Sequence, residues 1–356
     1  MHKPLVSVVM VACNVDRFLA ESIESILGQT FREFEFIIVD FGSTDKSRII
    51  ATNYAAKDSR IRVHGIPNCS LPEARNAGCF LAQGEYIAIA DADDVSLPNR
   101  LLWEVEFMEK HPEVGVLGGA VEWIDATGRP LMTMQHPLAY REIQSALQTH
   151  SVLWQPTVLI RQAAFVVVGG YRAAFTVSHD YDLWLRIAEH FQIANLEQVV
   201  LKYRIHPFQV SLRKRTQQTL CKLAAQVSAS SRRNGYTDPL NSVEEITSAV
   251  LAGLDVTDAR QQSELASDCR DWIRNMCMAG EYSAALKAAL EILQSDLKNV
   301  ERWQIADLYL TVAQLYWRQS RPLTSVLNVA KAALTRPVVV GRPLKRLLRR
   351  AWGGAS

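Results

Sequence analysis

The sequence predicts an α/β fold, in which a mostly parallel sheet is flanked by helices, followed by an all-α C-terminal region. In the first part of the chain, short runs rich in β-branched residues alternate with amphipathic segments of helical period. Such runs are typical of parallel strands that are covered on both faces. From about residue 217 the pattern becomes helical and Ala-rich. We expect domains at residues 1–212 and 213–335, followed by a tail at 336–356.

The first part of the chain alternates between strands and helices in a regular order. Short apolar runs predict strands at residues 6–12, 34–40, 60–66, 86–91 and 114–121. Amphipathic segments predict helices at residues 18–30, 43–57, 70–84 and 97–112. Ser43 or Thr44 is suited to cap the second helix. Pro72 and Gly84 are suited to the start and the end of the third.

After residue 121 the alternation becomes less regular. A loop and then a helix are expected at 128–144, a mixture of strand, helix and turn at 156–172, and an amphipathic helix at 177–191. Further on, Ala-rich segments of helical period are separated by short gaps. These segments predict helical hairpins, with no repeat period that can be defined.

Charge divides the chain into two different parts. Residues 1–212 carry 18 Lys and Arg against 24 Asp and Glu, whereas residues 213–356 carry 21 against 13. The second part therefore favours an anionic partner. None of the six cysteines forms a CxxC pair, which favours a reducing cytosol.

The N-terminal apolar run is open to two interpretations. "MVAC" resembles a lipoprotein cleavage site, but the run is short for a signal peptide and continues into the strand and helix pattern. We expect it to be the first buried strand. No stretch reaches the roughly 18 apolar residues that a membrane span needs. The expected location is therefore the cytoplasm.

Three carboxylates follow the buried strand predicted at 86–91. Asp91, Asp93 and Asp94 lie within four residues, where like charges repel and burial adds to the cost. A divalent cation such as Mg²⁺ or Mn²⁺ would offset that cost, because hard cations take oxygen ligands. The alternative is a solvated turn in which Asp94 or Ser96 caps the next helix. In open α/β sheets, ligands bind beyond this end of the strands.

Four other residues stand where a ligand site could form, each with a simpler alternative. Asp40 could contact a base or ribose or belong to an ordinary turn. Arg75 could reach a diphosphate or face solvent. Asp180 could act as a general base or cap a helix. His206 could contact a metal or phosphate or lie on the surface. The GxxxxGK[ST] and GxGxxG phosphate loops, zinc spacings and a Ser-His-Asp order are all missing from the sequence.

The order of these motifs carries more information than any one of them. "VSVVMVACN", "ESIESILGQTFREFEFIIVDFGSTD", "EARNAG", "GEYIAIADADD", "VGGYR", "HDYDLWLR" and "YRIHP" together resemble family 2 glycosyltransferases over about residues 4–212. The resemblance implies a GT-A fold with a Rossmann-like sheet. It also implies a nucleotide-diphospho-sugar donor, a divalent metal (Mn²⁺ or Mg²⁺) and inversion at the anomeric carbon.

The resemblance assigns roles to individual residues. "DADD" is similar to the family's metal motif, so Asp93 would contact donor ribose or metal and Asp94 the metal and diphosphate. Asp91 would join the nucleotide-sugar site. Asp180 falls where the family has its catalytic base, and His206 matches a histidine near the metal.

The donor turn and the acceptor region follow from the same comparison. Asp40 and Arg75 would bind the nucleotide-sugar, and the acceptor region would include residues 155–157 and 169–171. Two positions depart from the family pattern. Phe41 stands where a second acidic residue often contacts the base, so a UDP-sugar is favoured but not assured. His179 stands where Glu usually precedes the base, which changes the local charge.

The expected function is that of an inverting, metal-dependent glycosyltransferase acting on a glycan or glycolipid in bacterial surface polysaccharide assembly. One alternative is a sugar nucleotidyltransferase, which the missing Gly-rich N-terminal loop disfavours. The other is a non-catalytic nucleotide-sugar-binding scaffold, which only Phe41 and His179 support.

The C-terminal tail is basic and amphipathic. If residues 343–352 are helical, Leu344, Leu347, Leu348 and Trp352 oppose four basic side chains. This pattern predicts contact with an anionic membrane, on the inner face of the plasma membrane. Docking on the helical domain and disorder are the alternatives. Nucleic acid is not an expected partner, because the rest of the chain has no aromatic and basic stripe.

Overall fold

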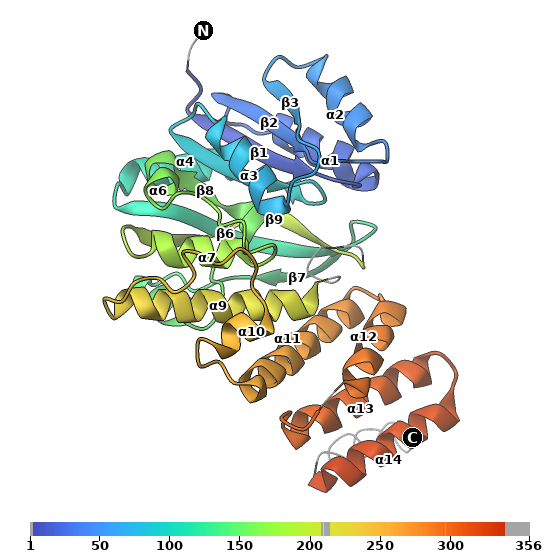
Figure 1. The fold of residues 1–356 in the computed structure, drawn as a ribbon. Coiled ribbons are helices and arrows are strands. Elements are labelled where there is room, and N and C mark those ends of the chain that lie inside the picture. Colours follow the sequence, from blue (N-terminus) through green and yellow to red (C-terminus); the bar gives the residue numbers. More distant parts are fainter. Residues whose placement is uncertain (1–2, 208, 210–213, 296, 339–356) are drawn as a thin grey trace. The chain divides into compact units, whose positions relative to one another are not determined.

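The computed structural model describes residues 3–207, 209, 214–295 and 297–338 (Figure 1). The chain forms two compact units, one of residues 1–205 and 220–247 and the other of residues 206–219 and 248–356. The first unit contains the sheet. The domain ranges expected from the sequence (1–212, 213–335 and 336–356) remain predictions, and most of the tail lies outside the described residues.

One mixed sheet of nine strands runs through the first unit in the order β3-β2-β1-β4-β8-β6-β9-β5, with β7 beside β6. The strands are β1 (Val6–Ala12), β2 (Phe34–Asp40), β3 (Ile61–Gly65), β4 (Tyr86–Asp91), β5 (Val95–Ser96), β6 (Val114–Asp125), β7 (Pro130–Met134), β8 (Leu159–Arg161) and β9 (Gln192–Ile205). Every residue of β1 and β2 is buried. The core of the unit therefore includes both of these strands along their whole length.

The pairing of the strands confirms the predicted α/β fold class. Strands β3, β2, β1 and β4 are parallel to one another, and β6 is parallel to β9. Strand β8 is antiparallel to both β4 and β6 and joins the two parallel groups. The short strands β5 and β7, antiparallel to β9 and β6, were not expected from the sequence.

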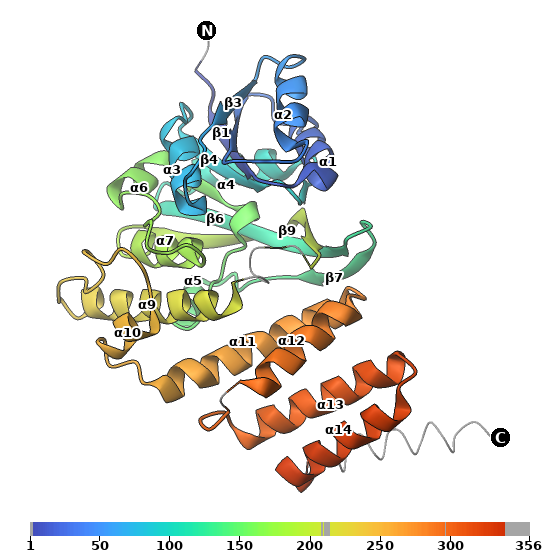
Figure 2. The same ribbon diagram turned by 45° about the vertical axis from the view of Figure 1, so that its right-hand side comes forward.

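Helices cover both faces of this sheet. Figure 2 shows α3 on one face of the first parallel strands and α1 and α2 on the other. The helices that lie wholly in this unit are α1 (Asp16–Leu27), α2 (Ser47–Ala55), α3 (Leu71–Phe80), α4 (Arg100–Lys110), α5 (Tyr140–Leu147), α6 (Gln162–Val167) and α7 (His179–Ile187), with the 3₁₀ turn η1 (Gln155–Thr157). Helix α9 (Arg215–Arg233) enters the unit at residue 220.

Helix α2 begins later than the sequence predicts, and neither Ser43 nor Thr44 caps it. The cap residue is Lys46, with no side-chain hydrogen bond. Ser43 Oγ instead accepts a hydrogen bond from the backbone N–H of Asn14 at 3.3 Å. The Asn14 side chain in turn accepts from the backbone N–H of Thr44 at 2.8 Å. The expected caps therefore tie the loop before α2 to the loop before α1.

Helix α3 has the start that its sequence predicts but ends earlier. Ser70 and Glu73 form a capping box, and the helix ends at Phe80 rather than near Gly84. A Cβ atom on Gly84 would lie 2.7 Å from the backbone nitrogen of Ser7. Gly84 therefore permits a close approach of the chain to β1 and is not a helix cap.

A fully buried ion pair supports the end of β4. Arg100 Nε lies 3.0 Å from Oε1 of Glu104, and both side chains are 0% exposed. Arg100 Nη2 also donates to the carbonyl of Ile89 at 2.8 Å. Burial raises the pKa of Glu104 to about 7, against the opposing effect of Arg100. The pair therefore anchors α4 to β4 two residues before Asp91.

The described residues of the second unit form helices joined by short turns, with no strand among them, as the sequence predicts. After α10 (Ser248–Ala252) it contains α11 (Asp258–Met278), α12 (Tyr282–Gln294), α13 (Arg302–Arg318) and α14 (Pro322–Thr335). Figures 1 and 2 show α11 to α14 as successive helical hairpins lying side by side. Across the described part of the chain, no helix combines the length and the apolar character needed to cross a bilayer.

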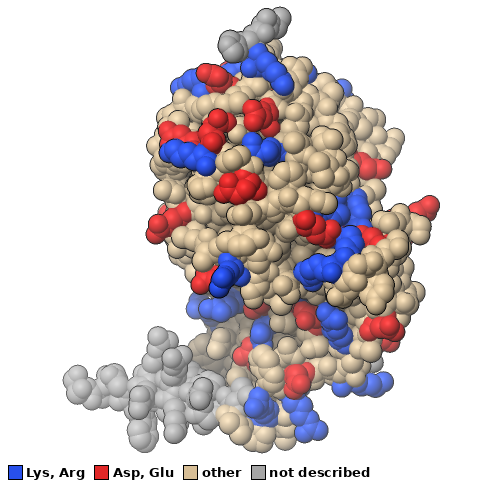
Figure 3. Space-filling model, turned by 90° about the vertical axis from the view of Figure 1, so that its left-hand side faces the viewer, with Lys and Arg blue, Asp and Glu red and all other residues tan. Residues whose placement is uncertain are grey.

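Charged side chains of both signs are mixed on the face shown in Figure 3, where no large region of one sign appears. A nucleic-acid-binding protein typically gathers Lys and Arg on one face or along one helix. The view in Figure 3 has no such gathering among the residues coloured there.

Candidate active site

The carboxyl ends of the parallel strands bring two predicted site residues to one edge of the sheet. In the register of β1, Ala12 pairs with Asp40 on one side and Val11 pairs with Asp91 on the other. Asp40 and Asp91 therefore end the two strands that flank β1. This is the edge at which ligands bind in open α/β sheets.

Arg75 of α3 is buried against this edge rather than facing solvent. Its Nη2 donates to Oδ1 of Asp91 at 2.7 Å, and its side chain is only 6% exposed. Its Nε has no hydrogen-bond partner among the described residues. Although burial lowers the pKa of Arg75, nearby Asp91, Tyr171 and Asp180 raise it, and the net shift is upward. Arg75 is thus a fixed cation shared by two of the predicted acidic residues.

The turn after β4 is held by β9 and α1. The backbone N–H of Arg204 donates to Oδ1 of Asp94 at 2.7 Å, and its guanidinium donates to the carbonyl of Asp93 at 2.8 Å. Ser22 of α1 donates to the carbonyl of Asp94 at 2.7 Å. The three aspartates are therefore presented by a turn whose backbone is bound from two sides.

Asp94 is the most deeply buried of the three carboxylates, at 3% exposed. Its Oδ2 is buried and has no hydrogen-bond partner among the described residues. Burial, with the charges of Asp93 and Asp91, raises the pKa of Asp94 well above its usual range, against the opposing effect of Arg204. A bound cation would stabilise the charged form of this carboxyl group.

The residues fit one mode of metal binding. Nowhere in the described ranges do three His, Cys, Asp or Glu side chains gather closely enough to hold a metal by themselves. Mg²⁺, however, is usually held by one or two carboxylates together with the phosphates of a substrate. The unpartnered Oδ2 of Asp94, beside the charge of Asp93, fits that mode.

Asp180 is the second residue of α7, which begins at His179 directly after Ser178 in a left-handed conformation (φ 50°). Burial raises the pKa of Asp180, while the backbone N–H of Tyr181 and the charge of Arg75 oppose the rise. The charge of Asp91 adds to it. Asp180 therefore belongs to the same electrostatic group as Arg75 and Asp91. A raised pKa suits a general base that works near neutral pH.

His179 differs from the acidic residue expected before a catalytic base. It is 5% exposed, and neither ring nitrogen has a hydrogen-bond partner in the described part of the chain. Burial and the charge of Arg75 lower the pKa of His179 well below its usual value, so the ring is neutral. Its ring meets that of Tyr171 edge to face, with centroids 5.3 Å apart. His179 therefore adds no charge next to Asp180.

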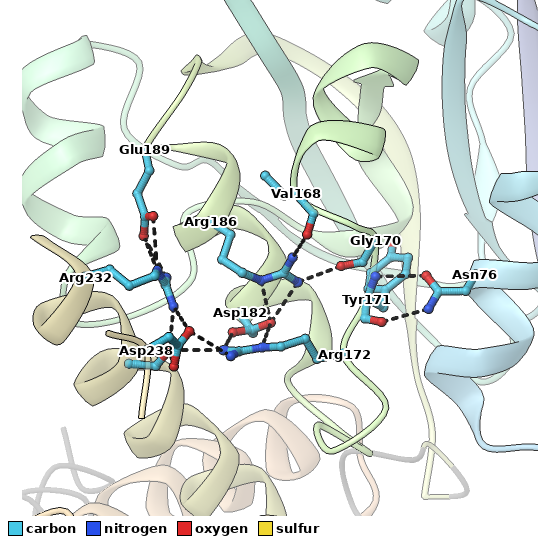
Figure 4. Close-up of polar contacts among 11 residues, drawn as sticks. Asn76, Val168, Gly170, Tyr171, Arg172, Asp182, Arg186, Glu189, Arg232 and Asp238 are labelled. Atoms are coloured by element: carbon cyan, nitrogen blue, oxygen red, sulfur yellow. Dashed lines mark hydrogen bonds and ion pairs between the residues drawn. The ribbon is translucent and has the colours of Figure 1, made fainter. Parts of the chain in front are cut away.

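A network of ion pairs fixes α7 (Figure 4). Asp182 receives hydrogen bonds from Arg172, and from Nη2 of Arg186 at 2.8 Å. Arg172 also donates to Asp238 at 2.9 Å. Arg232 of α9 bonds to Asp238 as well. The segment after α9 therefore contributes directly to the support of α7.

The turn at 169–171 is joined to both α7 and α3 (Figure 4). Arg186 donates to the carbonyls of Val168 at 2.6 Å and Gly170 at 2.7 Å. Asn76 of α3 exchanges two hydrogen bonds with the backbone of Tyr171, at 2.7 and 2.8 Å. Since Asn76 follows Arg75 in the sequence, these bonds fix the cation relative to α7.

Aromatic side chains that were not predicted from the sequence lie beside the acidic group. Burial and the charges of Asp94, Asp93, Asp91 and Asp180 raise the pKa of Tyr203. The Tyr203 ring lies 5.3 Å from Trp154 and 6.5 Å from Trp123 between centroids. The signal available in the sequence was their position: Tyr203 begins "YRIHP" and Trp154 directly precedes residue 155.

Two further predicted residues are Asp40 and His206. Asp40 Oδ1 accepts from the backbone N–H of Ser43 at 3.2 Å, so it also performs the turn role given as its alternative. His206 is buried and directly follows Ile205, the last residue of β9. The metal-binding role of His206 and the donor-binding role of Asp40 stay predictions.

Comparison with known proteins identifies the family. The model of glycosyl transferase family 2 matches residues 7–169. An uncharacterized glycosyltransferase of Methanocaldococcus jannaschii is 36% identical over 210 residues, covering 58% of this chain and 72% of that protein. The chain belongs to glycosyl transferase family 2. This family 2 glycosyltransferase is also 36% identical to the putative glycosyltransferase EpsE of Bacillus subtilis, over 56% of this chain and 73% of that protein.

Other similarities of this family 2 glycosyltransferase fit the same assignment. The O-antigen biosynthesis glycosyltransferase WbnJ of Escherichia coli is 30% identical over 57% of this chain and 80% of that protein. Among solved structures, S. aureus TarS 1–349 with UDP-GlcNAc has a TM-score of 0.52 at 17% identity, covering 91% of this chain and 90% of that one.

A second solved structure supports the same fold. Mannosyltransferase PcManGT from Pyrobaculum calidifontis, in complex with GDP-Man and Mn²⁺, has a TM-score of 0.52 at 17% identity. It covers 94% of this chain and 87% of that one. At this identity the likeness concerns the fold of the family 2 glycosyltransferase alone.

Proposed function

We propose that this glycosyltransferase transfers a sugar from a nucleotide-diphospho-sugar to an acceptor hydroxyl with inversion at the anomeric carbon. The observation that carries the proposal is the position of Arg75. This buried cation is hydrogen-bonded to Asp91 and interacts electrostatically with Asp180. A cation for the leaving group and a base for the acceptor thus belong to one electrostatic group.

In this reaction Asp180 takes the acceptor proton. As the acceptor oxygen attacks the anomeric carbon, the bond from that carbon to the diphosphate breaks on the opposite face. The electron pair leaves with the nucleoside diphosphate. Its negative charge is stabilised by Arg75, as preorganised cations stabilise transferring groups in other enzymes. The half-buried position of Asp180 raises its pKa by desolvation and makes it a stronger base.

The donor site extends along the carboxyl edge of the sheet, where Asp40, Arg75, Asp91 and Asp93 would bind the nucleotide-sugar. Asp93 and Asp94, with His206, would hold Mn²⁺ or Mg²⁺. When bound, such an ion supplies Lewis-acid stabilisation of the diphosphate. A UDP-sugar is the first donor to test. Phe41 stands in place of the acidic residue that often contacts the base. The identity of the base is therefore the part of the donor that the residues predict least.

The acceptor would approach from the side of Gln155 and Tyr171. Gln155 Nε2 donates to the hydroxyl of Tyr171 at 2.7 Å, which joins the two segments expected to meet the acceptor. Burial raises the pKa of Tyr171, while Arg75 lowers it and Asp180 raises it further. We infer that the acceptor is a glycan or glycolipid of a cell-surface polysaccharide, which the similarity to O-antigen biosynthesis glycosyltransferase WbnJ supports.

A two-part experiment tests the proposal. Thermal-shift screening with UDP-, GDP-, dTDP- and CMP-sugars, with and without Mn²⁺ or Mg²⁺, identifies the donor. A ligand at a hundredfold excess over Kd adds about 2.7 kcal/mol to the free energy of unfolding. Transfer is then measured for Asp180→Asn, with an expected loss of about 100- to 10,000-fold in rate and an unchanged donor shift. Full transfer by this variant, or no shift with any donor, would contradict the proposal.

A further inference from the structure

Helix α14 is built with its apolar side outward. It buries Ser325, Asn328 and Ala332. Its large aliphatic side chains are exposed instead, and they are Leu323 (82%), Val326 (61%), Leu327 (62%) and Leu334 (86%). Spacings of three, four and seven residues place these side chains on one face of the helix. A surface helix of a globular protein normally has the opposite arrangement.

The polar side chains on the inward face of α14 are nevertheless hydrogen-bonded. Ser325 Oγ donates to the carbonyl of Ala313 on α13 at 2.7 Å. Asn328 Nδ2 donates to the carbonyl of Thr324 at 2.8 Å. Turning the helix over would bury the leucines but break the contact between Ser325 and α13. The outward apolar stripe is therefore a consequence of specific packing, and large exposed apolar patches mark interaction sites.

The charges that follow Asp307 in the sequence all have one sign. From residue 308 to residue 356 the sequence has nine Lys and Arg and no Asp or Glu, with Asp307 the last acidic residue. Four of the basic residues lie in the described part, and they are Arg318, Arg321, Lys331 and Arg336. On α13, Trp317 is also 62% exposed. The exposed residues between Trp317 and Arg336 thus combine aliphatic side chains, one Trp and cations.

We propose that the outward face of α14, with Trp317, binds the surface of an anionic lipid bilayer. Helices that lie in the interface of a membrane combine an apolar face with Lys and Arg, and each cation adds about 1 kcal/mol of attraction to anionic lipid. The helix would lie along the surface, with Leu323, Leu327 and Leu334 entering the boundary between headgroups and acyl chains. This inference goes beyond the proposed function and does not depend on it.

Charge argues against two other occupants of the same face. A second copy of the chain would bring the same basic segment, residues 308–338, against this one, and like charges repel. Residues 339–356 of the chain carry five further Lys and Arg and no acidic residue. That segment would meet the same repulsion. A lipid surface removes it, because the headgroups carry negative charge.

Binding of the full-length protein to lipid vesicles tests this proposal. We expect cosedimentation with vesicles that contain phosphatidylglycerol, little with phosphatidylcholine alone, and release at about 1 M NaCl, where the Debye length is about 3 Å. The double variant Leu327→Ser and Leu334→Ser should bind the vesicles at least about tenfold more weakly than the wild type. Its matched control changes Val166 and Val167, each 58% exposed on α6, to Ser and should bind as the wild type does.

Three results would overturn the proposal. The first is absence of vesicle binding, or equal binding to neutral vesicles. The second is unchanged binding of the α14 variant together with loss of binding in Leu347→Ser and Leu348→Ser, which would assign the contact to the C-terminal segment. The third is a dimer in light scattering that the α14 variant converts to a monomer. Circular dichroism checks that each variant keeps its helices.

Discussion

Arg75 Nη2 donates a hydrogen bond of 2.7 Å to Oδ1 of Asp91, and this contact joins α3 to the carboxyl end of β4. The pair lies at the edge where a donor diphosphate would be bound. A second pair, Arg62 with Glu35, joins β3 to the beginning of β2 at the other edge of the same strands. Only the first pair lies at the edge proposed for catalysis. Variants of the two pairs can therefore distinguish an effect on catalysis from an effect on stability.

Arg75→Met should lower kcat/KM by about 100- to 1,000-fold, the loss typical of removing one preorganised donor. Arg62→Met is the matched control, because it also breaks an ion pair but at the far edge. It should lower the melting temperature with little effect on kcat/KM. Steady-state kinetics and thermal unfolding of both variants check this expectation. Equal losses of activity in the two variants would mean that Arg75 acts only through stability.

The pH dependence of kcat/KM should report the environment of Asp180. Its pKa is raised by burial, so activity should increase with pH as this carboxyl loses its proton. The charge of Arg75 lowers that pKa, and Arg75→Met should therefore move the acid limb to higher pH. His179→Gln should leave the limb in place, because His179 is already neutral. A limb at the same pH in Arg75→Met would exclude this coupling.

Much of the strand framework could be predicted, because a buried strand requires a short run of apolar residues that is visible in the sequence. The predicted strands at 6–12, 34–40 and 86–91 coincide with β1, β2 and β4. These are apolar runs whose residues lie inside the sheet, and a short run of that kind cannot face water. The expected carboxyl-edge site also follows from the order of strands and helices alone.

The contacts that shape the site could not be read from local pattern. The backbone of Arg204 binds Asp94 across 110 residues of sequence. Arg75 has the local signature of a surface residue, and its burial depends on how α3 packs against β4. Strand β5 is only two residues long. Each of these features is decided by tertiary pairing, which periodicity does not record.

Asp94 allows a test that separates metal binding from folding. Asn keeps an oxygen to accept from Arg204 and removes the charge, whereas Ala leaves that N–H unsatisfied. In wild type the raised folded-state pKa means that this carboxyl contributes stability below its unfolded pKa and loses it as pH rises through its folded value. Asp94→Asn should therefore match or exceed the stability of metal-free wild type at high pH.

Urea unfolding at several pH values measures this effect, and Asp94→Ala should lose about 1–3 kcal/mol. Adding Mn²⁺ with the donor should make the wild type more stable than Asp94→Asn. Wild type should gain stability from the ligand pair, and Asp94→Asn should gain much less. If both gain equally, Asp94 does not hold the metal and its role is to bind Arg204.

The last prediction concerns where the catalytic unit ends. Residues 220–247 belong to the first compact unit, and within them Asp238 bonds to Arg172, which also bonds to Asp182 of α7. A chain that stops at residue 212 loses this partner and leaves the charge of Arg172 partly uncompensated. Breaking a buried ion pair typically costs about 3–5 kcal/mol. Residues 1–247 should fold and show a donor-dependent thermal shift, whereas residues 1–212 should aggregate or melt earlier. Asp238→Asn in the full chain should reproduce part of the loss, and equal stability of the two shortened chains would show that this segment is dispensable.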